Sequence, residues 1–204
     1  TAEDARTLWE LVGVNPDPLS SNALSIGLAV GADHPLAPIL TSHSLAAEPV
    51  ILTLSQIKRW PIDPLPVDRC AFVVENPAIV AAAATQGWSG PPIICSSGRP
   101  SIAVVTLLRQ LGAHGAALHQ HADFDAAGLS ITAWLHSRAG TTPWQMTADT
   151  YRAAIGMQRE RPHLGGVVPA TPWDPELADA MEKHGHAVYE EELTEHLLTA
   201  MVSR

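Results

Sequence analysis

The chain has 204 residues, of which 46% are hydrophobic and 16% charged, and it carries a formal net charge of −9. This composition predicts a folded chain with a sizeable core and excludes an intrinsically disordered one. The acidic balance argues against a free-standing nucleic-acid binder, because such a protein needs a basic face to neutralise phosphates. No apolar run approaches about 18 residues, so we expect no membrane-spanning helix.

The two cysteines and the N-terminus predict the cellular compartment. Cys70 and Cys95 each border a predicted strand and are expected to be buried, reduced thiols. The N-terminus lacks the basic and apolar pattern of a signal peptide, so a cytoplasmic protein is predicted. Because the first residue is Thr1 rather than Met, we expect an upstream region in the complete protein.

Residues 1–68 are predicted to form a small α/β segment that precedes the main domain. Its predicted elements are a helix over 3–13, a strand over 23–30, a break over 33–38, a strand over 50–52 and a helix over 53–60. Thr53 and Gln56 fit a capping box at the start of the last helix. Prolines at 61, 64 and 66 mark residues 61–68 as a linker, and we place a domain boundary after residue 68.

From residue 69 to residue 204, predicted strands alternate with helices. The predicted strands span 71–74, 92–95, 115–120, 143–146 and 186–189. The predicted helices span 77–85, 100–111, 129–136, 147–155, 174–184 and 190–201, and 156–173 is predicted to be irregular. This alternation predicts an α/β fold with a mainly parallel sheet and helices on both of its faces.

Chemically reactive side chains follow three of the predicted strands. Glu75 comes directly after the first, the Ser96–Arg99 turn follows the second, and Asp123 and Asp125 follow the third. Parallel sheets bind ligands outside the carboxyl ends of their strands, so these loops are expected to meet at one edge. Three carboxylates placed there would suit Mg²⁺ or Mn²⁺.

Each of these motifs also has a purely structural interpretation. Asp123 and Asp125 fit turn and N-cap positions before the next helix equally well. Ser97 and Arg99 stand where a helix start can bind a phosphate oxygen, yet an N-cap followed by Pro100 explains most of that pattern. Gly128 is expected to let the chain turn sharply into the helix.

Two other function classes remain open from the residues alone. His119, His121 and Asp123 form an H-x-H-x-D run like that of zinc hydrolases, but Phe124 stands where a further histidine ligand would be needed. The acidic charge also fits a non-catalytic dimerisation or docking module.

Four motifs together resemble a known family. They are Phe72–Pro77, Cys95–Ser101, His121–Gly128 and Thr171–Asp174. A strand-final Glu followed by Asp-x-Asp-x-x-Gly resembles the TOPRIM domain of topoisomerases, primases and nucleases. The four motifs are similar to the C-terminal domain of JetD proteins from type II Wadjet systems, which are in turn similar to the topoisomerase VI A subunit. Leu8–Leu11 and Leu19–Ser21 resemble the segment that precedes this domain.

The resemblance implies a metal-dependent DNA endonuclease subunit of a bacterial anti-plasmid complex that works with SMC-type motor subunits. It implies that Glu75 is a metal ligand or general acid/base, and that Asp123 and Asp125 hold Mg²⁺ or Mn²⁺. Ser97, Arg99 and His121 would lie toward the DNA. Tyr151 and Tyr189 lie downstream of the acids, unlike the nucleophilic tyrosine of the topoisomerases, so attack by metal-activated water is expected. A homodimer is expected as well, because one site cuts one strand.

Overall fold

The computed structural model describes residues 17–63, 70–157 and 160–203. The helix expected over 3–13 lies outside them. Six strands form one sheet, in the order β2-β1-β4-β3-β5-β6. Their bounds are β1 Asn22–Ile26, β2 Val50–Thr53, β3 Cys70–Val74, β4 Ile93–Cys95, β5 Ala117–Gln120 and β6 Thr142–Pro143. β4, β3, β5 and β6 are parallel, whereas β1 runs antiparallel to both β2 and β4.

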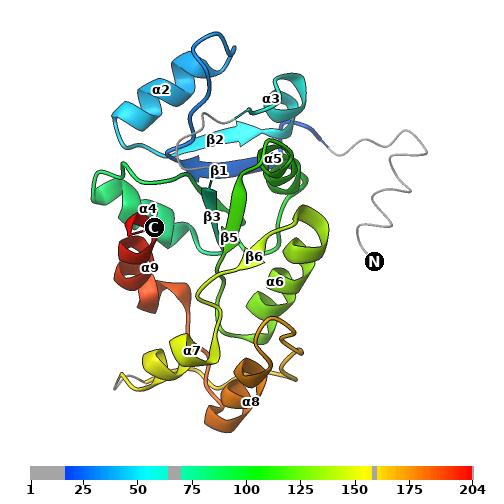
Figure 1. Cartoon of the computed structure of the whole chain (residues 1–204), viewed down its shortest axis with the longest axis vertical. Coiled ribbons are helices and arrows are strands. Elements are labelled where there is room, and N and C mark those ends of the chain that lie inside the picture. Colours follow the sequence, from blue (N-terminus) through cyan, green and yellow to red (C-terminus); the bar gives the residue numbers. More distant parts are fainter. Residues whose placement is uncertain (1–16, 64–69, 158–159, 204) are drawn as a thin grey trace, which may run out of the picture.

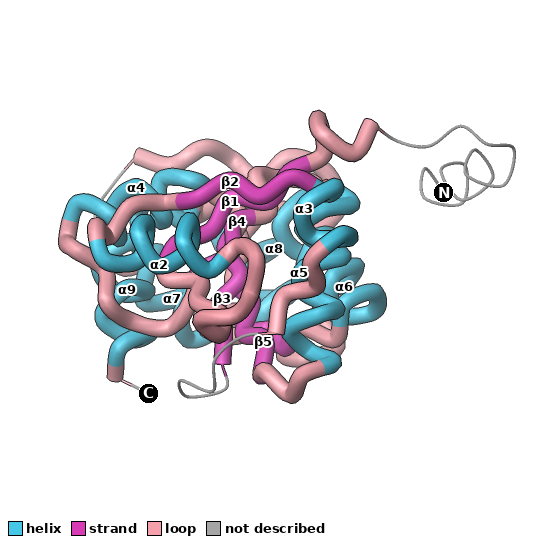
Figure 2. Tube along the Cα trace, turned by 90° about the horizontal axis from the view of Figure 1, so that it is seen from above, coloured by secondary structure: helices cyan, strands magenta, loops and turns pink. Residues whose placement is uncertain are grey.

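Helices cover both faces of this sheet, which confirms the predicted α/β class. Figure 2 shows the strands between α4, α7 and α9 on one side and α3, α5 and α6 on the other. The helix bounds are α2 Ala37–Leu45, α3 Leu54–Arg59, α4 Pro77–Thr85, α5 Ile102–Ala113, α6 Ala126–Ala139, α7 Ala148–Ile155, α8 Pro175–His184, the 3₁₀ helix η1 Glu190–Leu193, and α9 Thr194–Val202. No helix in the described ranges is long and apolar enough to cross a membrane.

The alternation of side chains along β3 divides the core into two layers. Phe72 and Val74 pack into the cluster formed with α4, α7, α8 and α9. Ala71 and Val73 pack into the cluster formed with α2, α3 and α5. Successive strand residues point to opposite faces, so a strand buried on both faces is continuously apolar, as β3 is.

Several helix starts follow the predicted capping chemistry. The Thr53 side chain accepts from the backbone N–H of Gln56, and the Gln56 side chain accepts from the N–H of Thr53, as a capping box requires. Thr147 caps α7 by accepting from the N–H of Thr150. These side chains satisfy N–H groups that the first turn of a helix otherwise leaves free.

Several expectations about the bounds of elements were wrong. Helix α2 occupies part of a region predicted to be broken, because Pro38 lies in its first turn, where no donor is needed. Helix α6 begins at Ala126 rather than residue 129. The strand expected over 186–189 makes two isolated bridges, with Val188 opposite Phe124, because Phe124 lies beyond the end of β5.

Strands from both sides of the proline-rich segment 61–68 belong to the same sheet. β1 pairs with β2 on one side and with β4 on the other. Figure 1 shows β1 and β2 lying across one end of the parallel strands. Strands from both predicted segments therefore belong to one sheet. The loops described next follow the ends of β3, β4 and β5 in that sheet.

Candidate functional site

The loops predicted to meet at one sheet edge do so. Glu75 follows β3, Ser96 follows β4 and His121 follows β5. The Ser96 N–H donates to the carbonyl of Val74 at 2.8 Å, and the His121 N–H donates to the carbonyl of Val73 at 2.9 Å. These main-chain bonds extend the parallel ladder past the strand ends and fix the loops against one another.

Glu75 and Asp123 are in direct contact. The Asp123 N–H donates to Glu75 Oε2 at 3.3 Å. Burial raises the pKa of Glu75 to about 7, and the negative charge of Asp123 adds to the shift. Burial also raises the pKa of Asp123 to about 6, with further contributions from Glu190 and Asp125. The shared rise shows that several carboxylates occupy one weakly solvated site.

Asp125 caps helix α6. Its Oδ1 accepts from the N–H of Gly128 at 2.7 Å, so the N-cap interpretation of this residue is correct. The cap uses one oxygen of the carboxylate, and its charge still reaches Glu75 and Asp123. The cap therefore holds Asp125 at the start of α6, and the charge of Asp125 still acts on Glu75 and Asp123.

Gly128 has a different role from the one expected. It lies inside α6 and lacks a positive φ, so no sharp turn requires it. Instead, a Cβ added there would lie 2.1 Å from the carbonyl oxygen of Asp123. The glycine thus allows the Asp123 loop to fold directly onto the first turn of α6.

Glu190 is a central residue that the sequence did not identify. It is 0% exposed, and its Oε2 accepts from the backbone N–H groups of Glu75 at 2.9 Å and Asn76 at 2.6 Å. Its own N–H donates to Asp123 Oδ1 at 2.7 Å. Glu190 therefore ties the loops that carry Glu75 and Asp123 to the segment that joins α8 to α9, orange to red in Figure 1. In the sequence it is one of three consecutive acids at the start of the helix predicted over 190–201, where the helix dipole alone favours acidic residues.

His121 lies beneath the acids rather than on the surface. The side chain is 1% exposed, and its Nδ1 lies 3.0 Å from Glu190 Oε1. Its Nε2 is buried without a hydrogen-bond partner in the described residues. Burial lowers the pKa of His121 to about 3 and raises that of Glu190 to about 8, so both groups are driven toward their uncharged forms. This position suits support of Glu190 better than contact with DNA.

The described residues contain no three His, Cys, Asp or Glu side chains already gathered to hold a metal ion. Mg²⁺, however, is usually bound through one or two carboxylates together with water and substrate phosphates. Glu75 and Asp123, whose pKa values are raised by burial, fit that donor set, and the charge of Asp125 acts on both of them. The zinc alternative needs His119 as a metal ligand. In the structure the His119 ring packs against the Phe72 ring, with ring centroids 5.5 Å apart.

The turn after β4 brings Arg99 to the same edge. Ser97 and Gly98 both have positive φ, at 54° and 73°, and the Gly98 N–H donates to the carbonyl of Glu75 at 3.2 Å. Ser97 and Arg99 are exposed. Arg99 and Glu75 line a common pocket of about 480 Å³. The predicted phosphate-binding turn therefore borders the acidic cluster.

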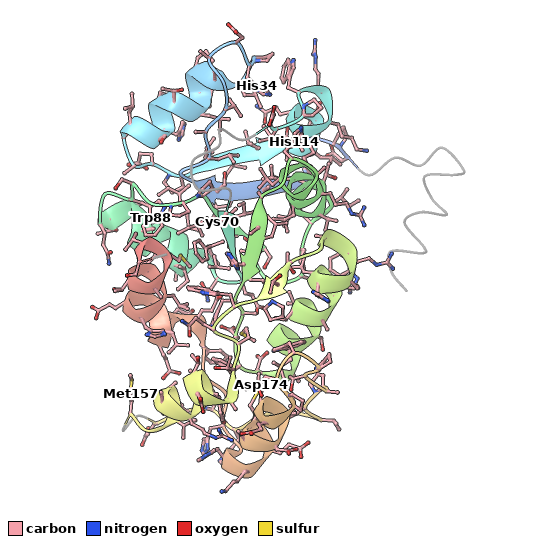
Figure 3. The ribbon with its side chains drawn as sticks, in the orientation of Figure 1. His34, Cys70, Trp88, His114, Met157 and Asp174 are labelled. Carbon is pink, nitrogen blue, oxygen red and sulfur yellow. The ribbon has the colours of Figure 1, made fainter. Side chains whose placement is uncertain are left out.

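The Thr171–Asp174 motif lies outside the acidic site. Asp174, labelled in Figure 3, lies between α7 and α8. Its Oδ2 accepts from the N–H of Ala148 at 2.8 Å, and its Oδ1 accepts from the N–H of Glu176 at 3.1 Å. One carboxylate thus caps two helices, which gives this motif a structural function.

Comparison with known families assigns the chain. A family model described as "Protein of unknown function C-terminus (DUF2399)" matches residues 50–201. The chain belongs to the DUF2399 family. The match to DUF2399 includes Glu75, Asp123, Asp125 and Glu190. None of the curated proteins compared with the chain matches it.

Proposed function

We propose that this DUF2399 chain is a divalent-metal-dependent DNA endonuclease subunit that hydrolyses phosphodiester bonds at the edge formed by Glu75, Asp123 and Asp125. The observation that carries the proposal is the contact between Glu75 and Asp123 beside the exposed Arg99. A purely structural role does not require acids with raised pKa values beside a turn that carries an arginine. Perturbed titratable groups gathered at a pocket are typical of functional sites.

The resemblance to JetD proteins and TOPRIM nucleases supports the same proposal. DUF2399 is associated with JetD-like proteins, and all four quoted motifs fall within the matched residues 50–201. We therefore propose plasmid DNA as the substrate, SMC-type motor subunits as partners, a homodimer as the cutting unit, and the cytoplasm as the compartment.

The roles follow from the geometry. Glu75 and Asp123 would hold Mg²⁺ or Mn²⁺ with Asp125, and the bound ion would supply charge neutralisation at the phosphate and a more acidic water. Arg99 binds a phosphate oxygen and orients the strand. A carboxylate oxygen of Glu75 that does not bind the ion would accept a proton from the attacking water.

The tyrosines favour water as the nucleophile. Tyr151 is 0% exposed and its hydroxyl donates to the carbonyl of His186 at 2.7 Å. Tyr189 is 38% exposed and precedes Glu190. A Tyr189→Phe variant is therefore expected to retain cleavage, whereas a covalent tyrosyl–DNA mechanism would lose it.

The test is nicking of supercoiled plasmid by the full-length protein with its SMC-type partners, in Mn²⁺ or Mg²⁺. Asp123→Ala and Glu75→Gln are expected to reduce nicking by at least about 100-fold, because loss of even an outer-shell partner of a metal ligand costs about 10- to 100-fold. Asp149→Ala is the matched control, because Asp149 is an exposed acid on α7 that pairs with Arg152. Equal nicking by the wild type and Asp123→Ala would overturn the proposal. Absence of any metal binding in a calorimetric titration would favour the non-catalytic docking module.

A further inference from the structure

The pocket beside Glu75 extends away from the acids. It has a volume of about 480 Å³ and lies between the β4–α5 loop and helix α6. Its lining residues on α6 are Ala127, Ser130, Ile131 and Trp134. This spacing of three, four and seven residues places them on one face of the helix. The α6 face therefore forms an apolar wall that starts at the acidic cluster and ends at an indole ring.

The bulky residues of this wall are held in place from behind. Ile131 and Trp134 are half-buried and pack against the core layer formed by α2, α3 and α5. A side chain anchored on its inner side and accessible on its outer side loses little conformational entropy when a ligand packs on it. Trp134 thus offers a fixed aromatic surface to the pocket.

The opposite wall carries the positive charge. Gly98, Arg99 and Pro100 line it, and Arg99 makes no ion pair or hydrogen bond with the described residues. The pocket therefore combines a carboxylate end, a guanidinium and an aromatic face. A nucleotide has the complementary parts, since its phosphates suit the guanidinium and a metal ion, and its base suits an aromatic face.

We propose that this pocket binds one unpaired nucleotide next to the phosphate that is cut, with its base against Trp134 and Ile131 and its adjoining phosphate on Arg99. The proposal rests on the function proposed above and adds a substrate preference to it. A base inside a duplex has both faces covered by its neighbours, so it reaches α6 only when it leaves the stack. The chain is therefore specific for DNA that carries an unpaired nucleotide at the cleavage position.

The experiment compares two labelled duplexes that carry one bulged position, occupied in one by a base and in the other by an abasic residue. Binding by the full-length protein is measured by fluorescence anisotropy without metal ion, and cleavage is measured separately with Mn²⁺. The wild type is expected to bind the base-containing bulge at least about 5-fold more tightly, as loss of base–aromatic stacking implies.

Variants test whether this ratio of the two binding affinities depends on the pocket. Trp134→Ala is expected to reduce it to near one, whereas Trp134→Phe retains most of it. Arg99→Ala is expected to weaken binding of both duplexes and leave their ratio unchanged. Trp60→Ala and Arg59→Ala are matched controls, because these residues form a cation–π pair at the end of α3, outside the pocket. Thermal unfolding midpoints identify any variant that fails to fold.

The outcomes separate the two proposals. A ratio of one in the wild type, or an undiminished ratio in Trp134→Ala, overturns the nucleotide pocket even when metal-dependent cleavage is present. A ratio that depends on Trp134 in a protein that does not cleave even with its SMC-type partners supports the pocket and overturns the endonuclease.

Discussion

Two neighbouring residues at the end of β5, Gln120 and His121, are equally buried but belong to very different polar networks. Gln120 donates from Nε2 to Thr132 Oγ1 at 3.1 Å and accepts at Oε1 from Thr141 Oγ1 at 3.0 Å. This network is neutral. His121 has one ring nitrogen paired with Glu190 and the other without a partner in the described residues, next to acids with raised pKa values.

The difference separates a structural network from a functional one. A buried polar network that satisfies its members stabilises the fold, whereas like charges and orphaned polar atoms oppose it. Gln120 and its two threonine partners therefore stabilise the fold, whereas His121 and the acids beyond the end of β5 lower its stability. Destabilising arrangements of this kind cluster at functional sites.

The largest effect is expected from Gly128→Ala. The new Cβ would lie 2.1 Å from the Asp123 carbonyl oxygen, so the acidic loop must move away from α6. We expect nicking to fall by at least about 100-fold and the free energy of unfolding to fall by about 3 kcal/mol or more, the upper range for an overpacked core. Plasmid nicking and urea denaturation measure both.

Gly112→Ala is its matched control within another helix. A Cβ at Gly112 meets Leu118 Cδ1 at 3.7 Å, an ordinary contact, and Gly112 lies in α5. This variant is expected to be neutral or more stable by up to about 1 kcal/mol, because alanine favours helix. Full activity of Gly128→Ala would contradict the role given to the close approach.

Substitution of Glu190 tests whether this residue holds the loops of Glu75 and Asp123 in place. Glu190→Ala leaves the N–H groups of Glu75 and Asn76 and the ring of His121 without their partner. We expect the free energy of unfolding to fall by about 3 kcal/mol and nicking to fall about 10- to 100-fold. Glu190→Gln keeps an oxygen that can accept from the two N–H groups, so it should lose less of both.

The control for Glu190 is Glu195→Ala, which removes an exposed acid from α9. It is expected to leave stability and nicking unchanged. If Glu190→Ala matched this control in nicking while unfolding more easily, Glu190 would be a structural residue that does not position the acids.

The sequence predicted the parallel strands and the edge at which Glu75 and Asp123 meet, because continuous apolar runs and helix caps are local signals. It did not predict the place of Glu190, because the residue acts across more than a hundred positions through bonds to Glu75 and Asn76. It gave the wrong reason for Gly128, because close approach of the Asp123 loop depends on packing. The Asp125 cap was one of two interpretations that local sequence left open.

The pH dependence of stability distinguishes the acidic site from the rest of the core. The folded-state pKa values of Glu75, about 7, and Asp123, about 6, lie above the unfolded values of 4.5 and 3.8. Between about pH 4 and pH 7 the folded state therefore binds more protons, so these groups lower the free energy of unfolding as pH rises. Asp123→Asn should remove part of this decline without metal ion.

At about pH 8 in a chelator, Asp123→Asn is thus expected to be more stable than the wild type, and at about pH 4 the two should be equal. Urea denaturation across this range measures the difference. Added Mn²⁺ should stabilise the wild type more at about pH 8 than at about pH 5, because binding needs ionised carboxylates. Parallel stability curves for the two proteins would contradict the assigned burial of Asp123.

The smallest effect is expected from the neutral network on the other side of β5. Thr141→Val removes the hydroxyl that donates to Gln120 Oε1, and Thr141 is 0% exposed. The free energy of unfolding should fall by about 1 kcal/mol, the net contribution of one neutral hydrogen bond. Nicking and Mn²⁺ binding should not change, because Gln120 and His121 point to opposite faces of the chain. Loss of Mn²⁺ binding in Thr141→Val would show that the two networks are coupled through the end of β5, and that the contrast between them is one of charge alone.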